Sequence, residues 1–224
     1  MSYIGFGINR EIERPDLSLV ERFKGIPVAN IADNMNRMNV LEPGIKCLGG
    51  TPMAGVAFTV KAPDGDNLMF HKALDLAKPG DIIVVSSISG AERALCGEIM
   101  MRYARSLGLA GFVLDGYIRD IDGVSELGFP VYARGVTALG PYKNGPGEIN
   151  VPVAVGRQVI MPGDILVGDS DGVVVIRPED AEGVLEKALR HNAGEEVSMR
   201  DIAEGRGLPR AWVDEFLTVK GCPV

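Results

Sequence analysis

The stretch from Cys96 to Pro130 constrains the fold more than any other, because it predicts a helix followed at once by a buried strand. Apolar side chains recur every four residues at Ile99, Tyr103 and Leu107, the spacing of a helix with one buried face. Gly111 to Leu114 is a short apolar run, typical of a strand that is buried on both faces. A helix leading directly into such a strand indicates an α/β protein.

Polar residues follow this strand directly. Asp115 and Gly116 predict a turn at its carboxyl end, and Arg119 and Asp120 come next, at the edge of the sheet where α/β proteins bind ligands. The planar guanidinium of Arg119 matches a carboxylate. Asp115, Asp120 and Glu98 supply hard oxygen atoms of the kind that suit magnesium or manganese. The segment therefore predicts a site for a carboxylate ligand that chelates a divalent cation.

The start of the preceding helix, near Gly97, is a second feature that suits an anion. Its first amides have no partner within the helix, and the helix dipole makes this end positive. A glycine there would let a ligand approach the backbone closely. Simpler interpretations exist for single residues, because Asp120 could cap the next helix and Arg119 could form a solvated ion pair with it. The order of the whole segment is more specific than any one residue.

This order resembles the signature of the 4-hydroxy-4-methyl-2-oxoglutarate aldolase family, which also contains the regulators of RNase E activity. The resemblance extends over about residues 28–189 and rests on Gly97-Glu98, Gly108, Gly111, Asp115-Gly116, Arg119-Asp120 and Gly128-Phe129-Pro130-Val131. It implies a three-layer β/β/α swivelling fold at residues 28–190, with an N-terminal arm and helix at 1–27. Residues 191–224 would form a C-terminal extension packed on its own or a neighbouring subunit, in a homotrimer or hexamer.

The resemblance also implies an activity. It is that of a metal-dependent lyase, which cleaves a 4-hydroxy-2-oxo acid to pyruvate through a metal-stabilised enolate and decarboxylates oxaloacetate as a side activity. Asp120 would hold Mg²⁺ or Mn²⁺, and Arg119 would bind the keto oxygen or the leaving alkoxide. At the turn made by Gly97, the amides of Ile99 and Met100 would bind the carboxylate of the small 2-oxo acid.

Further acidic residues have less certain places in this scheme. Glu98 stands where the family often has aspartate, so its reach to a metal-bound water differs by one methylene. Asp115 would order either the end of the strand or the second shell of the metal. Glu195 or Glu196 matches the spacing of a family glutamate that reaches into the neighbouring subunit's site, although such a pair is commonly just solvated.

Three alternatives stay open. The chain could be a non-catalytic protein regulator of an RNase E-type enzyme, or another enzyme that uses the same metal site on a different acid. A Schiff-base aldolase would need a desolvated lysine, for which Lys61 is the best candidate. The two histidines, His71 and His191, lack zinc-ligand spacing, which argues against zinc hydrolysis.

The composition of the chain limits the kinds of partner and the compartment that we expect for it. A net charge of −7 argues against binding to nucleic acid. The three cysteines, Cys47, Cys96 and Cys222, are scattered, which indicates a reducing cytoplasm. The acidic N-terminal segment does not resemble a signal peptide, and no apolar run reaches the length of a membrane span. We therefore expect a cytoplasmic protein that does not bind membranes.

The rest of the chain contains segments with the periodicity of helices and segments with the pattern of strands. Helices are predicted at residues 17–23, 28–38, 71–77 and 179–189, and strands at 53–60, 82–85, 165–167 and 173–176. A hairpin turn at residues 169–172 joins the last two strands. Leu208, Trp212 and Phe216 make the tail too apolar to be simply disordered.

Overall fold

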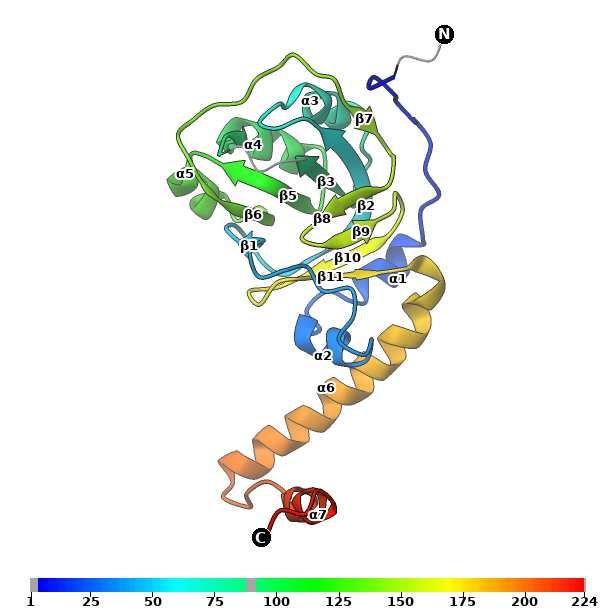
Figure 1. Cartoon of the computed structure of the whole chain (residues 1–224), viewed down its shortest axis with the longest axis vertical. Coiled ribbons are helices and arrows are strands. Elements are labelled where there is room, and N and C mark those ends of the chain that lie inside the picture. The colour runs from blue at the N-terminus through cyan, green and yellow to red at the C-terminus, as the bar shows by residue number, and fades with distance from the viewer. Residues whose placement is uncertain (1–3, 88–91, 224) are drawn as a thin grey trace.

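The structure, a computed structural model, describes residues 4–87 and 92–223. Its body is a curled mixed β-sheet, and one long helix leads from this body to the C-terminus (Figure 1). The helices are α1 Leu17–Glu21, α2 Val28–Asp33, α3 Leu68–Leu74, α4 Glu98–Ser106, α5 Ile121–Leu127, α6 Ala181–Ala203 and α7 Ala211–Val219, with a 3₁₀ turn at Pro178–Asp180. The strands are β1 Lys46–Cys47, β2 Met53–Ala62, β3 Asp81–Ser87, β4 Ala94–Cys96, β5 Gly111–Ile118, β6 Val131–Val136, β7 Glu148–Ile149, β8 Val153–Val155, β9 Gln158–Ile160, β10 Ile165–Gly168 and β11 Val173–Ile176.

Four parallel strands form the centre of the sheet. The strand order is β1-β6-β5-β3-β2-β10-β11, in which β6, β5, β3 and β2 are parallel and the outer strands are antiparallel. The central strands are rich in apolar residues because both of their faces are covered. Since they are parallel, their carboxyl ends lie along one edge of the sheet.

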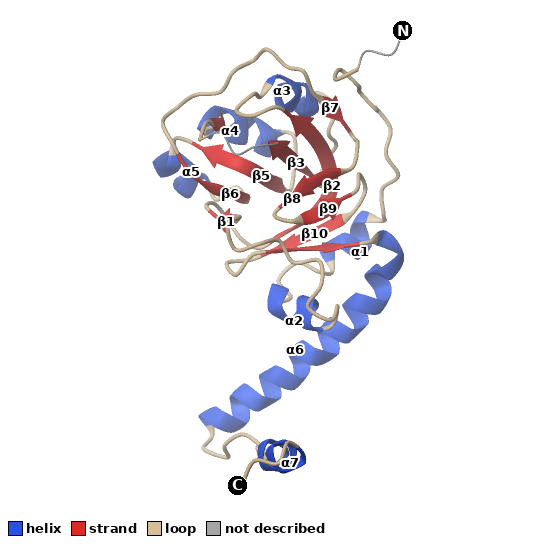
Figure 2. Cartoon of the chain, viewed as in Figure 1, coloured by secondary structure: helices blue, strands red, loops and turns tan. Residues whose placement is uncertain are grey.

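Apolar clusters on the two faces of the sheet define three layers. On one face α3, α4 and α5 cover the centre, where Phe112 makes edge-to-face contacts with Phe70 and Phe129 at 4.9 and 5.0 Å between ring centroids. Helices α1, α2 and α6 cover the β10–β11 end of the same face. On the other face Val155 of the β8–β9 hairpin packs over Val84. Figure 2 shows the strands gathered in the body, and the expected β/β/α order is confirmed.

The structure corrects two local predictions in the segment from Cys96 to Pro130. Strand β5 continues past Asp115 and Gly116 to Ile118, so the predicted turn is wrong; the short strand β4 pairs with its last residues and extends it. In α4 the buried face is formed by Met101 and Ala104, whereas the predicted stripe is largely exposed, with Ile99 84% and Tyr103 49% accessible.

The C-terminal helix is longer than predicted. It was expected to end at residue 189, but α6 continues to Ala203 and includes Glu195 and Glu196. Its outer part leaves the body, and α7 lies at its far end (Figure 1). No residue of α7 is buried, and Trp212 and Phe216 are more than half exposed. The described residues of α7 therefore have no buried packing, and the packing of the extension on its own or a neighbouring subunit stays a prediction.

None of the described helices combines the length and the apolar character needed to cross a membrane. All three cysteines are free thiols.

An extended N-terminal arm is fastened along the body. Ile8 forms a bridge with Ile149, and Asn9 and Asn150 exchange hydrogen bonds between side chain and backbone. Arg14 binds the fully buried carboxylate of Asp81 through two bonds of 2.8 and 2.7 Å. The arm thus supplies the counter-charge of a buried acid.

We expect Arg14→Met to lower the free energy of unfolding by about 3 kcal/mol, because it leaves a buried carboxylate without its ion-pair partner. Chemical denaturation of this variant beside Arg10→Met, an exposed arginine of the same arm, isolates the effect. Equal midpoints for the two variants would show that solvent already screens the Arg14–Asp81 pair.

Candidate active site

Asp120 contacts the start of α4. Its backbone is left-handed, with φ 61° and ψ 40°, and it occupies the position before the first residue of α5. The side chain nevertheless makes no capping hydrogen bond to α5. Instead, Oδ2 accepts a hydrogen bond of 3.2 Å from the amide of Glu98. The simple helix-cap interpretation of Asp120 is therefore wrong.

Gly97 makes this contact possible. A Cβ atom at this position would lie 2.2 Å from Oδ2 of Asp120, a distance that no side chain can adopt. The amide of Arg119 donates to the carbonyl of Cys96 at 3.1 Å, which places the end of β5 beside the turn between β4 and α4. The guanidinium of Arg119 lies 3.7 Å from Asp120, with both side chains about half exposed.

These groups surround a cavity of about 210 Å³. Its lining residues are Asn67, His71, Cys96, Gly97, Ile99, Met100, Arg119, Asp120, Pro141 and Lys143. The structure therefore brings together five residues that the sequence placed in one site, namely Gly97, Ile99, Met100, Arg119 and Asp120. The amides of the first turn of α4 have no acceptor within the helix, so this wall of the cavity suits an anion.

Three further polar residues of the lining, Asn67, His71 and Lys143, were not among the predicted site residues. Asn67 is 2% exposed; its Nδ2 donates to the carbonyl of Leu95 at 2.8 Å, and its Oδ1 has no partner within the described part of the chain. Burial, and next the charge of Lys143, lower the pKa of His71, so its imidazole is neutral at pH 7. The polar run that ends at Asn67, just before a helix, was the available signal.

Glu98 begins α4, but its carboxylate turns away from the cavity. It accepts a hydrogen bond of 2.6 Å from Arg102, one helical turn further on, and lies over Gly123 of α5. A role for Glu98 in holding a metal-bound water stays a prediction.

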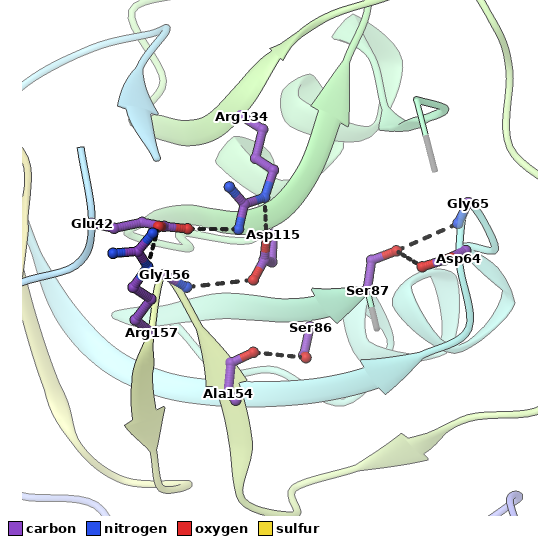
Figure 3. Close-up of polar contacts among 10 residues, drawn as sticks. All are labelled: Glu42, Asp64, Gly65, Ser86, Ser87, Asp115, Arg134, Ala154, Gly156 and Arg157. Atoms are coloured by element: carbon purple, nitrogen blue, oxygen red, sulfur yellow. Dashed lines mark hydrogen bonds and ion pairs between the residues drawn. The ribbon is translucent and has the colours of Figure 1, made fainter. Parts of the chain in front are cut away.

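Asp115 lies in a different region of the sheet, not beside Arg119 and Asp120. Figure 3 shows its carboxylate paired with Arg134, which also donates to Glu42 at 2.8 Å. Glu42 binds Arg157 as well, at 2.8 Å. The predicted place of Asp115 beside Arg119 and Asp120 is thus wrong, because the continued strand directs its side chain into this ionic network. Its role in ordering the strand end or the second shell of the metal stays a prediction.

Lys61 and Asp115 line another cavity, which does not include Arg119 or Asp120. The side chain of Lys61 is 46% exposed, and its ammonium lies 3.2 Å from Glu148. An exposed, paired lysine away from Arg119 does not suit Schiff-base formation, which requires a desolvated amine. Cys96 is no better as a nucleophile, because burial and then the charge of Asp120 raise the pKa of its thiol.

Glu195 and Glu196 lie on α6, which packs at the other end of the helical layer from α4 (Figure 1). Glu195 accepts a hydrogen bond of 2.7 Å from Asn30, and Glu196 accepts one of 3.1 Å from Asn192. Within one chain neither residue reaches Arg119 and Asp120. Any part they take in the site would be in that of another subunit.

The donor set of the cavity fits a cation such as Mg²⁺. Asp120 is the one carboxylate among the described lining residues, and no three described His, Cys, Asp or Glu side chains form a metal-binding group. Mg²⁺ commonly takes one or two protein carboxylates and completes its shell with water and substrate oxygens. The exposed Asp120, beside amides that suit the acid group of a chelating ligand, matches this pattern.

Fold and site together define an α/β protein with a candidate anion site at the edge of a parallel sheet. A family model described as RraA-like, Aldolase/RraA, matches residues 28–175. The chain belongs to this family.

Both branches of the family occur among similar proteins. A Halalkalibacterium halodurans protein named "Putative 4-hydroxy-4-methyl-2-oxoglutarate aldolase" is 38% identical, over 92% of this chain and 99% of its own length. A Streptomyces coelicolor member of the RNase ES inhibitor RraA family is 31% identical, with a TM-score of 0.75 over 84% of this chain and 99% of its own. The RNA-processing inhibitor RraA of Thermus thermophilis has a TM-score of 0.61 and 28% identity, over 66% of this chain and 91% of its own.

We expect Gly97→Ala to weaken Mg²⁺ binding at least tenfold while the protein stays folded, because the new methyl group displaces the Asp120 carboxylate. Calorimetric titration with Mg²⁺ measures the affinity, and circular dichroism reports the fold. Gly183→Ala is the matched control, since a Cβ atom there meets no atom within 4 Å. Unchanged Mg²⁺ affinity in Gly97→Ala would separate Asp120 from cation binding.

Proposed function

We propose that this protein is a divalent-metal-dependent lyase that cleaves a 4-hydroxy-2-oxo acid, of the 4-hydroxy-4-methyl-2-oxoglutarate type, to pyruvate. The observation that carries the proposal is the contact of Asp120 with the start of α4 beside Arg119, around one cavity. The aldolase name of the H. halodurans relative supports the substrate class.

Each group has a role in this reaction. The amides of Ile99 and Met100 bind the carboxylate next to the 2-oxo group, where the helix dipole stabilises negative charge. Asp120 would hold Mg²⁺ or Mn²⁺, which supplies Lewis-acid polarisation of the 2-oxo oxygen.

Cleavage breaks the C3–C4 bond and moves its electron pair towards the 2-oxo group, while the C4 hydroxyl gives its proton to water and becomes a carbonyl. The enolate left at C2–C3 then takes a proton from water at C3 and is released as pyruvate. Arg119 is placed to stabilise the negative charge on the C4 oxygen through its fork of N–H donors. Decarboxylation of oxaloacetate moves electrons towards the same oxygen, so it is the expected side activity. The site would work in a cytoplasmic homotrimer or hexamer that binds neither nucleic acid nor membrane.

A second candidate is a non-catalytic protein regulator of an RNase E-type enzyme. The match to the S. coelicolor inhibitor family member favours it. With a net charge of −7 the chain would act on such an enzyme through protein contact and not by competing for RNA. Metal-dependent turnover is what distinguishes the two functions.

We expect purified protein to release pyruvate from 4-hydroxy-4-methyl-2-oxoglutarate and from oxaloacetate, to lose this activity in EDTA, and to regain it with Mg²⁺ or Mn²⁺. A coupled lactate dehydrogenase assay measures the pyruvate. Borohydride added with substrate should not inactivate the protein, because the lysine among the described lining residues, Lys143, is exposed and not desolvated. Absence of turnover with either metal would refute the lyase, and a covalent adduct on Lys61 would replace it with a Schiff-base enzyme.

The outer part of α6 leaves the body of the chain (Figure 1). We propose that Glu195 or Glu196 completes the site of a neighbouring subunit. Asp120→Ala, and separately Glu195→Ala with Glu196→Ala, should each abolish most activity. After equal amounts are unfolded together and refolded, about a quarter of the sites in a closed ring would combine an intact Asp120 with intact glutamates. Pyruvate release should return to roughly that fraction of wild type.

The control is the same mixing of Asp120→Ala with wild type, which shows that refolded chains exchange. A glutamate double variant that is fully active alone would exclude the shared site. So would a mixture that forms oligomers and stays inactive.

A further inference from the structure

A buried carboxylate fastens the loop at residues 140–147 to the start of α3. Asp66 is 3% exposed, and its carboxylate accepts three backbone hydrogen bonds: from Leu68 at 2.9 Å, Asn144 at 2.6 Å and Gly145 at 3.0 Å. Hydrogen bonds to an ionised group are stronger than neutral ones. One side chain thus joins two segments that lie far apart in the sequence.

The other side of the loop is held as well. Tyr142 exchanges backbone bonds with the Asp66 turn, accepting from Asn67 at 3.0 Å and donating to Gly65 at 2.7 Å. Arg93 donates to the carbonyl of Gly140 at 2.8 Å and to the Tyr142 hydroxyl at 2.9 Å, with its guanidinium 4.0 Å from the centre of the Tyr142 ring. The loop is therefore fixed on both sides of Lys143.

Lys143 itself lines the cavity that contains Arg119 and Asp120. It makes no ion pair with any described residue. Burial, and then the charge of Lys143, lower the pKa of the neighbouring His71, which disfavours a positive charge on that imidazole. Among the described lining residues the cationic side chains are thus Arg119 and Lys143, and the carboxylate is Asp120.

We infer that Lys143 is the specificity-determining residue that binds the second acid group of the substrate, at the end away from the 2-oxo group. The inference rests on the proposed function, in which α4, Asp120 and Arg119 hold the reacting end. A flexible ammonium is a point charge that accepts a carboxylate from several directions. Asp66 is a positioning residue, because its three bonds fix the backbone beside Lys143.

Binding of two inert acids tests the inference. Pyruvate has one carboxylate, whereas 2-oxoglutarate has a second one and lacks the 4-hydroxyl group needed for cleavage. Calorimetry with Mg²⁺ at pH 8 should show wild type binding 2-oxoglutarate about ten- to a hundredfold more tightly than pyruvate, the range of one hydrogen bond to a charged group.

Lys143→Met should lose most of this preference, and Lys143→Arg should keep most of it because the charge remains. Lys187→Met, at an exposed position on α6, is the control and should match wild type. Asp66→Asn should also reduce the preference although Lys143 is intact. If Asp66→Asn does not fold, the Lys143 variants decide alone.

Two results would overturn the inference: equal affinity of wild type for the two acids, or a preserved preference in folded Lys143→Met. Failure of the proposed function gives a different pattern. Wild type would then release no pyruvate from any 4-hydroxy-2-oxo acid, while the preference for 2-oxoglutarate and its loss in Lys143→Met would still be measured.

Discussion

The site depends on the hydrogen bond between the carboxylate of Asp120 and the amide of Glu98, which only glycine at position 97 permits. This bond joins the end of β5 to the start of α4, two elements that the sheet already brings together through β4. It leaves the next two amides of the helix facing the cavity with no acceptor of their own. Asp120, the positive start of α4 and Arg119 thus surround one cavity. Their charges do not cancel completely.

The positions of the charged groups in the cavity are set by the backbone, and not by strong ion pairs between side chains. Arg119 and Asp120 are 3.7 Å apart and half exposed, so their ion pair contributes little stability and either can turn to a ligand. Glu98 is paired with Arg102, and Asp115 with Arg134, which removes both from the cavity. The same acidic residues that looked equivalent in the sequence therefore divide into one that is available to a cation and two that stabilise the fold.

The central part of the site was predictable because strand end and helix start are adjacent in sequence as well as in space. Gly97, Ile99, Met100, Arg119 and Asp120 all belong to one helix–strand unit, and the β/β/α order followed from their resemblance to a known family. Asp115 was misplaced because pairing with β4 extends β5, which no local pattern shows. Asn67 and Lys143 were not among the predicted site residues because each lies in a turn-like run, and only tertiary contacts bring those runs to the cavity. The place of Glu195 depends on a second subunit, which one chain's sequence does not contain.

Enzyme and inhibitor share this fold, so the distinction between them must come from features that only one function requires. A protein that acts through its outer surface needs no anchored loop inside a cavity. Here a buried carboxylate, three backbone donors and the stacked pair of Arg93 and Tyr142 fix the loop that carries Lys143. Burying a charge is costly unless it is hydrogen-bonded, and the carboxylate of Asp66 meets that condition through its three backbone donors. A fixed loop that presents the unpaired Lys143 to the cavity would hold a small acid in one orientation. Catalysis requires such an orientation.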